Sequence, residues 1–116
     1  MFKVADNTGA LTARCIRILK NVRKREIRIG DRVVVVLKTI KPNKDKLKVG
    51  MIRRGIVVRT KNMFKRKRGV IIRFGENAVI LTNRSGVPSS KRLKGPILYE
   101  LCLKYRFIAS LARNVI

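Results

Sequence analysis

The residues that could carry acid–base chemistry are few and far apart in this sequence. No histidine is present, so no side chain has an ordinary pKa near neutral pH for proton transfer. The Ser-x-Lys spacing from Ser89 to Lys91 fits a loop that touches phosphate better than a catalytic pair. The acids are scattered, and we expect them to cap or bond turns: Asp6, Glu26, Asp31, Asp45, Glu76 and Glu100. The sequence therefore predicts a protein that is not an enzyme and needs no cofactor.

The two cysteines, Cys15 and Cys102, each lie among apolar neighbours and far from one another. Free cysteine is commonly buried, so we expect two reduced, buried thiols in preference to a disulfide or a ligand pair. Two thiols without histidine cannot complete a tetrahedral metal site unless carboxylates stand nearby at suitable spacing, and none do. No metal site is predicted.

Positive charge dominates the chain. Thirty Lys and Arg stand against six Asp and Glu, which gives a net charge of +24 over 116 residues. The stretch IVVRTKNMFKRKRGVIIRF, residues 56–74, joins two β-prone runs through a connection that carries six cations and no acid, and no acid occurs between Asp45 and Glu76. A solvated surface does not require such an imbalance, whereas a polyanion relieves it by releasing its condensed counterions. Segments 59–68 and 84–94 are therefore predicted to contact phosphates.

Aromatic residues are too few to form a platform on which single-stranded bases stack. Phe64 is the one stacking candidate, and a simple anchoring role fits it equally well. Phe74 and Tyr99 are expected in the core. These residues favour recognition of the backbone and shape of folded RNA over the reading of bases.

Short strands must position these cations. Alternation predicts a half-buried strand at 12–20, and the apolar, β-branched run 32–40 predicts a central strand. Another strand is expected at 51–60, with Gly55 as a bulge or a point of close backbone approach. Residues 41–50 predict a hairpin or a projecting ribbon. The runs 70–74 and 77–83 are expected to pair around a turn at Gly75 and Glu76.

The pattern becomes helical after Pro96. Two short helices are expected, one with Leu98, Leu101 and Cys102 on its apolar face and one with Ile108, Leu111 and Ala112. Many short strands followed by a small helical end predict a mainly β fold, a compact barrel. We expect a single domain over 1–116, with the barrel, ribbon and basic loops in 1–95 and the helical region in 96–116.

No membrane association is expected. The longest apolar run, residues 33–37, is far too short to span a bilayer as a helix. The start MFKVADNTGAL lacks an apolar signal region and carries Asp6.

Four stretches resemble the universal family of large-subunit ribosomal proteins numbered fourteen. They are VADNTGA (4–10), IVVRTK (56–61), VIIRFGENAVILTN (70–83) and GPILYEL…ASLARNVI (95–116). The resemblance implies a five-stranded β-barrel with a projecting ribbon, and binding to large-subunit rRNA. It also implies contact with ribosomal proteins three and nineteen, a bridge to small-subunit rRNA at the intersubunit face, no catalysis, and docking of a ribosome-silencing factor.

The resemblance carries several residues into the predicted site, among them Asn7 in the 4–10 loop, Arg73 in the IRF strand and Arg92 before Gly95-Pro96. Together with the basic segments, it gives a predicted RNA-binding set of Asn7, Arg59, Lys61, Lys65, Arg66, Lys67, Arg68, Arg73, Arg84, Lys91, Arg92 and Lys94.

Some positions depart from the family pattern. Lys91 stands in place of a usual threonine and Phe107 in place of a lysine, which weakens the expectation of silencing-factor binding. The closing SLARNVI and the very basic 21–29 suggest a divergent organellar member. A nuclear-encoded organellar protein normally carries a presequence, so we expect a processed chain, or one made inside the organelle or in a bacterium. We place it in the mitochondrion, with a bacterial cytoplasm or a plastid as alternatives.

Another class of function competes with this interpretation: a free-standing, OB-like module that binds single-stranded RNA. It predicts equal affinity for unstructured and folded RNA, and a large loss on Phe64→Ala. The shortage of exposed aromatics argues against it.

Overall fold

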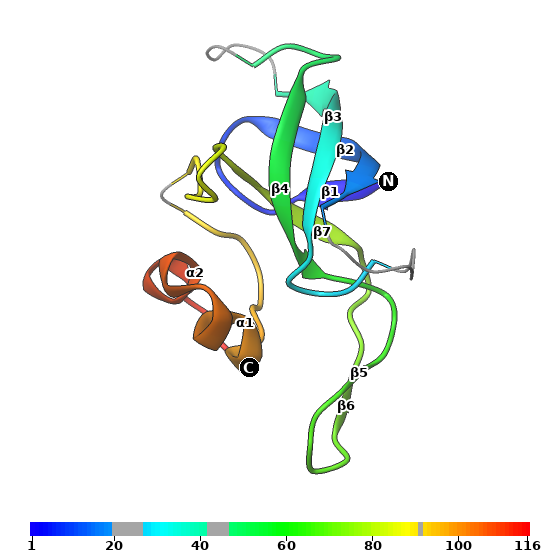
Figure 1. Cartoon of the computed structure of the whole chain (residues 1–116), viewed down its shortest axis with the longest axis vertical. Helices are drawn as coiled ribbons and strands as arrows, with labels where there is room; N and C mark the ends of the chain where they lie inside the picture. The colour runs from blue at the N-terminus through cyan, green and yellow to red at the C-terminus, as the bar shows by residue number, and fades with distance from the viewer. Residues whose placement is uncertain (20–26, 42–46, 91) are drawn as a thin grey trace.

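The computed structural model describes residues 1–19, 27–41, 47–90 and 92–116, and its centre is a closed β-barrel (Figure 1). Around the barrel the strands follow the order β1 (Phe2–Val4), β2 (Ala10–Ile18), β3 (Arg32–Ile40), β4 (Ile52–Arg59) and β7 (Ala78–Thr82). All neighbours are antiparallel except β1 and β7, which run parallel. The predicted five-stranded barrel is confirmed, and its closure leaves these strands without a free edge.

One face of each strand fills the barrel interior. Val33, Val35 and Leu37 of β3 are fully buried, while the alternate residues Val34 and Val36 are only partly covered. They pack in a cluster completed by Phe2, Val4, Ala10, Ala13, Val57, Val79 and Leu81. The alternation expected for a β-strand therefore separates an inner from an outer face.

Gly55 marks a close approach of two strands. A Cβ at this position would lie 2.7 Å from the carbonyl oxygen of Ile80 and 2.7 Å from a methyl of Val79. The expected close approach at Gly55 is thus confirmed, whereas the register shift of this strand pair lies further along, between Val57 and Arg59. Any side chain here would separate β4 from β7.

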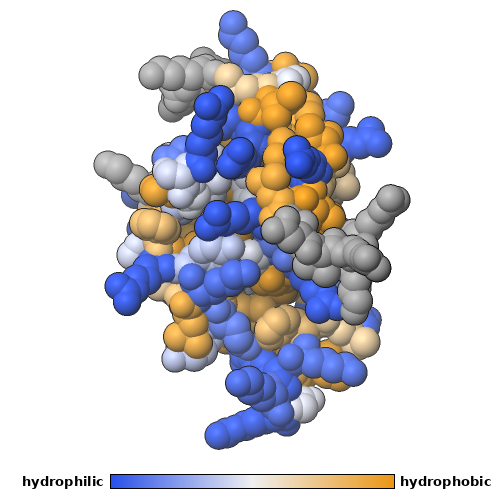
Figure 2. Space-filling view, in the orientation of Figure 1, coloured by the Kyte–Doolittle hydropathy of each residue, from blue (hydrophilic) through white to orange (hydrophobic). Residues whose placement is uncertain are grey.

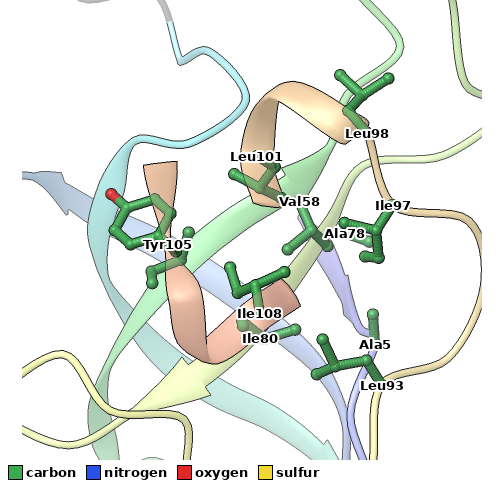
Figure 3. Packing of buried hydrophobic residues seen from close by; sticks show 11 residues of the cluster. Ala5, Val58, Ala78, Ile80, Leu93, Ile97, Leu98, Leu101, Tyr105 and Ile108 are labelled. Carbon is green, nitrogen blue, oxygen red and sulfur yellow. The ribbon is translucent and has the colours of Figure 1, made fainter. Parts of the chain in front are cut away.

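A second core lies outside the barrel, between it and the C-terminal segment (Figure 3). Ile56 and Val58 of β4 and Ile80 of β7 point outward and meet residues from the chain after the barrel. The cluster is completed by Ala5, Ala78, Leu93, Ile97, Leu98, Leu101, Tyr105 and Ile108. The barrel therefore gains hydrophobic stabilisation on its outer face where β4 and β7 are covered.

The two predicted short helices are confirmed as α1 (Tyr99–Lys104) and α2 (Arg106–Leu111), each of six residues. They close this second core. The sequence offered no breaker between them. The structure places Tyr105 there in an extended conformation, with φ −126° and ψ 107°. Its buried hydroxyl donates to the carbonyl oxygen of Gly30 at 2.8 Å, which fastens the helices to the turn before β3. The prediction that Tyr99 lies in the core is wrong, because this residue is 56% exposed.

The predicted pairing of 70–74 with 77–83 is also wrong. Strand β6 (Ile71–Ile72) pairs with β5 (Phe64–Lys65), and the two form a hairpin that projects from the barrel (Figure 1). Strand β7 cannot pair with β6 because both of its edges are taken, by β1 and β4. A tight turn closes the hairpin, with Gly69 at φ +85°.

The projecting ribbon that the structure describes is β5–β6. The hairpin or ribbon predicted over residues 41–50 joins the antiparallel strands β3 and β4. Residues 42–46 of that segment lie outside the described residues. On either side of them, Gly50 N donates to Leu37 O at 2.9 Å and Leu37 N donates to Met51 O at 3.0 Å.

Candidate nucleic-acid interface

The β5–β6 hairpin gathers one group of the predicted RNA-binding residues. Lys61, Lys65, Lys67, Arg68 and Arg73 are all exposed along it. In Figure 2, hydrophilic side chains crowd the end of the molecule where Figure 1 places the hairpin tip. The hairpin thus presents a concentrated positive charge beyond the barrel.

Arg66 belongs to the same hairpin but is turned toward the protein. Its Nε and Nη2 donate to the two carboxylate oxygens of Glu100 in α1 at 2.7 and 2.9 Å. Nη2 also donates to the carbonyl oxygen of Ile116 at 2.6 Å. This hydrogen bonding from Arg66 lowers the pKa of the Glu100 carboxyl. Arg66 therefore clasps the hairpin to the helical region, and its cationic neighbours remain outside the clasp.

Arg59, the first cation of the segment, lies inside the protein. Only 5% of its side chain is exposed. Nη1 donates to the carbonyl oxygens of Lys94 and Pro96 at 2.8 and 3.1 Å, and Nη2 meets Glu76 Oε1 at 3.3 Å. Burial lowers the pKa of this guanidinium, while Glu76 raises it. Arg59 has no exposed face for a phosphate, so we leave it out of the interface and assign it a structural role.

Gly95 makes room for that buried guanidinium. Its φ is +83°, and a Cβ added there would lie 2.7 Å from Arg59 Nη1. Any other residue would strain the backbone and displace the guanidinium.

The second predicted segment, 84–94, is a chain of turns with exposed Arg84, Arg92 and Lys94. The side-chain oxygen of Asn83 accepts hydrogen bonds from Ser85 N and Val87 N, both at 3.0 Å, which sets the turn that carries Arg84. Lys94 N donates to Ala5 O at 2.6 Å. The segment is thus fixed to the barrel by its backbone, and its cationic side chains are left at the surface. Lys91 lies outside the described residues.

The loop around Asn7 is fixed by a buried acid. Asp6 is 3% exposed and accepts hydrogen bonds from Leu81 N at 2.8 Å and from the Thr8 hydroxyl at 2.6 Å. Burial raises the pKa of this carboxyl, and the hydrogen bonds from Thr8 and Leu81 oppose that rise. Asn7 N donates to Ser90 Oγ at 3.1 Å, so the exposed Asn7 adjoins the basic turns.

A barrel with basic appendages is what the sequence resemblance implied. The model of the family Ribosomal protein L14p/L23e matches residues 1–116, the whole chain. The chain belongs to this family. As an L14p/L23e protein it has a structural role in the large ribosomal subunit, and the predicted family is confirmed.

The remaining acids of this L14p/L23e chain serve its structure in two ways. Asp31 accepts from Arg28 N at 2.8 Å and bonds a turn, as expected. Glu76 instead forms ion pairs, at 3.3 Å with both Arg59 and Lys3, as Glu100 does with Arg66. Glu26 and Asp45 lie outside the described residues. Among those described, no three His, Cys, Asp or Glu side chains gather where they could hold a metal ion.

Two smaller predictions concern Phe64 and the cysteines. Phe64 is partly buried and packs against the outer core, which favours the anchoring interpretation over base stacking. Cys15 and Cys102 are free thiols, but each is half-buried where full burial was expected. Burial raises the pKa of both, which favours the protonated thiol.

Within the described ranges, no helix is long and apolar enough to cross a membrane.

Sequence reasoning did not single out three arginines of β3 and β4, Arg32, Arg53 and Arg54. They stand singly or in a pair within apolar runs, so no basic stretch drew attention to them. The two-residue period of β4 was the available signal, because it places Arg54 on the same face of the strand as Ile56 and Val58, which belong to the outer core.

Proposed function

We propose that this L14p/L23e protein binds large-subunit rRNA through the β5–β6 hairpin and the basic turns 84–94. The observation that carries the proposal is the hairpin itself. Among the described residues, Arg66 is its one cation with an acidic partner and is clasped to Glu100, while Lys65, Lys67 and Arg68 beside it are exposed. Cations held on a projecting, clasped hairpin suit the phosphates of a neighbouring RNA helix.

The proposed mechanism is electrostatic. Lysine and arginine side chains displace counterions condensed on the RNA, and the entropy of their release drives binding. Recognition of backbone and shape is favoured because Phe64 is partly buried against the outer core, whereas single-strand binders stack bases on exposed aromatic rings. Lys61, Lys65, Lys67, Arg68 and Arg73 form the proposed main contact.

The wider placement is carried over from the family resemblance. We propose contacts with ribosomal proteins three and nineteen, a bridge to small-subunit rRNA, and a mitochondrial large subunit as the location. Phe107, which departs from the family pattern, is 49% exposed on α2, where it would alter any surface offered to a silencing factor. Sedimentation of organelle extract tests this placement: we expect the chain in the large-subunit particle, and recovery only in light, RNA-free fractions would contradict it.

Salt dependence tests the RNA-binding proposal. If about six phosphates are neutralised, the logarithm of the affinity for large-subunit rRNA falls against the logarithm of salt with a slope of about −5. The pair Lys67→Gln and Arg68→Gln should make that slope shallower by about two and leave the melting temperature unchanged. The pair Lys38→Gln and Lys41→Gln, exposed on and just after β3, is the matched control.

Two outcomes would contradict the proposal. A wild-type slope near zero would remove the electrostatic mechanism. Equal affinity for an unstructured RNA of the same length, together with a large loss on Phe64→Ala, would favour the single-strand-binding module instead.

A further inference from the structure

Two adjoining cavities of about 560 and 240 Å³ lie between β4 and the turn that follows β7. They share Arg54, Thr82, Asn83 and Arg84 in their walls, so we treat them together as one basic surface groove. Arg53 lines the larger cavity and Arg32 the smaller one. We call this the arginine groove and define it by Arg32, Arg53, Arg54 and Arg84.

The groove walls carry positive charge only. Four arginines line the two cavities, and no acidic residue does. Guanidinium groups repel one another, and an anion bound between them offsets that repulsion. Arginine also offers two parallel N–H donors, a geometry that matches the oxygens of a phosphate.

Two of the arginines are held by the protein and two are not. Arg53 Nη2 donates to Ser89 Oγ at 2.8 Å, and the Arg32 guanidinium lies 5.9 Å from the centre of the Tyr105 ring. Arg54 and Arg84 make no side-chain hydrogen bond or ion pair with another described residue. The strand register sets Arg54 directly beside Thr82, two residues before Arg84. The groove thus combines two positioned guanidinium groups with two that are available to a ligand.

The walls also carry apolar side chains beside the polar Thr82 and Asn83. Val34 and Ile52 line the larger cavity, and Leu19 and Ile56 the smaller one. A single phosphate ion needs only the charged groups. A phosphodiester backbone alternates charged phosphates with less polar riboses, and so uses both the arginines and the surface between them.

The arginine groove and the hairpin lie in different parts of the molecule. Figure 1 places the turn after β7 beside the barrel and the β5–β6 hairpin beyond the opposite end of β4. We infer that the arginine groove binds a second phosphodiester strand of rRNA, apart from the one at the hairpin. The protein then holds two RNA segments at a fixed separation. The inference rests on the proposed RNA binding and adds a second strand to it.

Substitution of the two available arginines tests the groove. The pair Arg54→Gln and Arg84→Gln should weaken binding of the full chain to large-subunit rRNA about tenfold and make the salt slope shallower by about two. The control pair Lys38→Gln and Lys41→Gln removes the same charge outside the groove, and we expect less than about a threefold change. Thermal unfolding of each variant confirms that it is folded.

Hydroxyl-radical footprinting separates the two RNA strands. We expect the groove variant to lose one protected stretch of rRNA and to keep the stretch that Lys67→Gln with Arg68→Gln removes. Binding and footprint equal to the control pair would overturn the groove alone. A wild-type salt slope near zero would instead remove the RNA-binding proposal, so the two failures are distinguishable.

Inorganic phosphate is the competing occupant. If phosphate alone stabilises the wild-type chain saturably, the groove variant loses that effect, and rRNA binding equals the control, then the groove binds a free anion and the inference is wrong. No saturable phosphate effect, with the lost footprint, supports an RNA strand.

Discussion

Arg59 and the pair Lys67–Arg68 belong to one basic segment, yet they have opposite environments. The side chain of Arg59 is 5% exposed, and its guanidinium donates to two carbonyl oxygens of the 94–96 turn. Lys67 and Arg68 stand at the tip of the hairpin, exposed. A cation can therefore hold the chain together or present charge to a partner, and charge counts along the sequence do not distinguish the two. Measurements of the free energy of unfolding distinguish the two roles.

The largest effect on stability is expected at Arg59. Arg59→Met leaves the carbonyl oxygens of Lys94 and Pro96 without their donor and Glu76 without its buried partner. We expect the free energy of unfolding to fall by about 3 kcal/mol. Chemical denaturation measures it, with Lys61→Met as the exposed control, expected within about 0.5 kcal/mol of wild type. Equal losses in the two variants would refute the structural role of Arg59.

A smaller loss is expected from Gly95→Ala. The substitution strains a φ of +83° and brings Cβ to 2.7 Å from Arg59 Nη1, so we expect about 2 kcal/mol. Gly69→Ala is the matched control, because φ is +85° there and no atom lies within 4 Å of the added Cβ; we expect about 1 kcal/mol. The excess at Gly95 should vanish when Arg59→Met is also present, and additive losses would contradict this contact.

The smallest effect is expected at the hairpin clasp. Glu100→Gln should cost about 0.5 kcal/mol at neutral pH, since the pair with Arg66 is partly exposed. Hydrogen bonding from Arg66 lowers the pKa of Glu100 in the folded state. The carboxylate therefore stabilises the fold above its unfolded pKa, and this contribution disappears as the pH falls through the lower, folded value.

Urea unfolding of wild type and Glu100→Gln at several pH values between neutral and strongly acid measures that clasp. The two curves should converge as the pH falls. A difference that stays constant with pH, or a double-mutant cycle with Arg66→Gln that gives no coupling, would mean that Arg66 and Glu100 do not stabilise one another.

Local patterns in the sequence predicted most of the barrel. The alternation at 12–20, the β-branched run 32–40 and the apolar helical faces after Pro96 each depend on neighbouring residues, and each gave the right element. The prediction for β6 failed because its pairing depends on distant strands: in the folded barrel β1 and β4 occupy both edges of β7.

The candidate site was less predictable for the same reason. The exposed cations of the hairpin follow from their place in one short segment. The burial of Arg59 depends on a turn 35 residues away, and the pairing of Arg66 on a helix 34 residues away. The arginine groove joins side chains of β3, β4 and the turn after β7, which only the closed barrel brings together.

The parallel pairing of β1 with β7 has a consequence for the growing chain. Lys3 lies beside Ala78, so the first strand finds its last neighbour only after some seventy-five further residues have been made. Closing so long a loop is entropically costly, and contacts of such sequence separation slow folding. Until β7 has been synthesised, β1 and β4 each have one edge without a partner strand. The cations of the β5–β6 hairpin are therefore synthesised before the barrel that positions them can close.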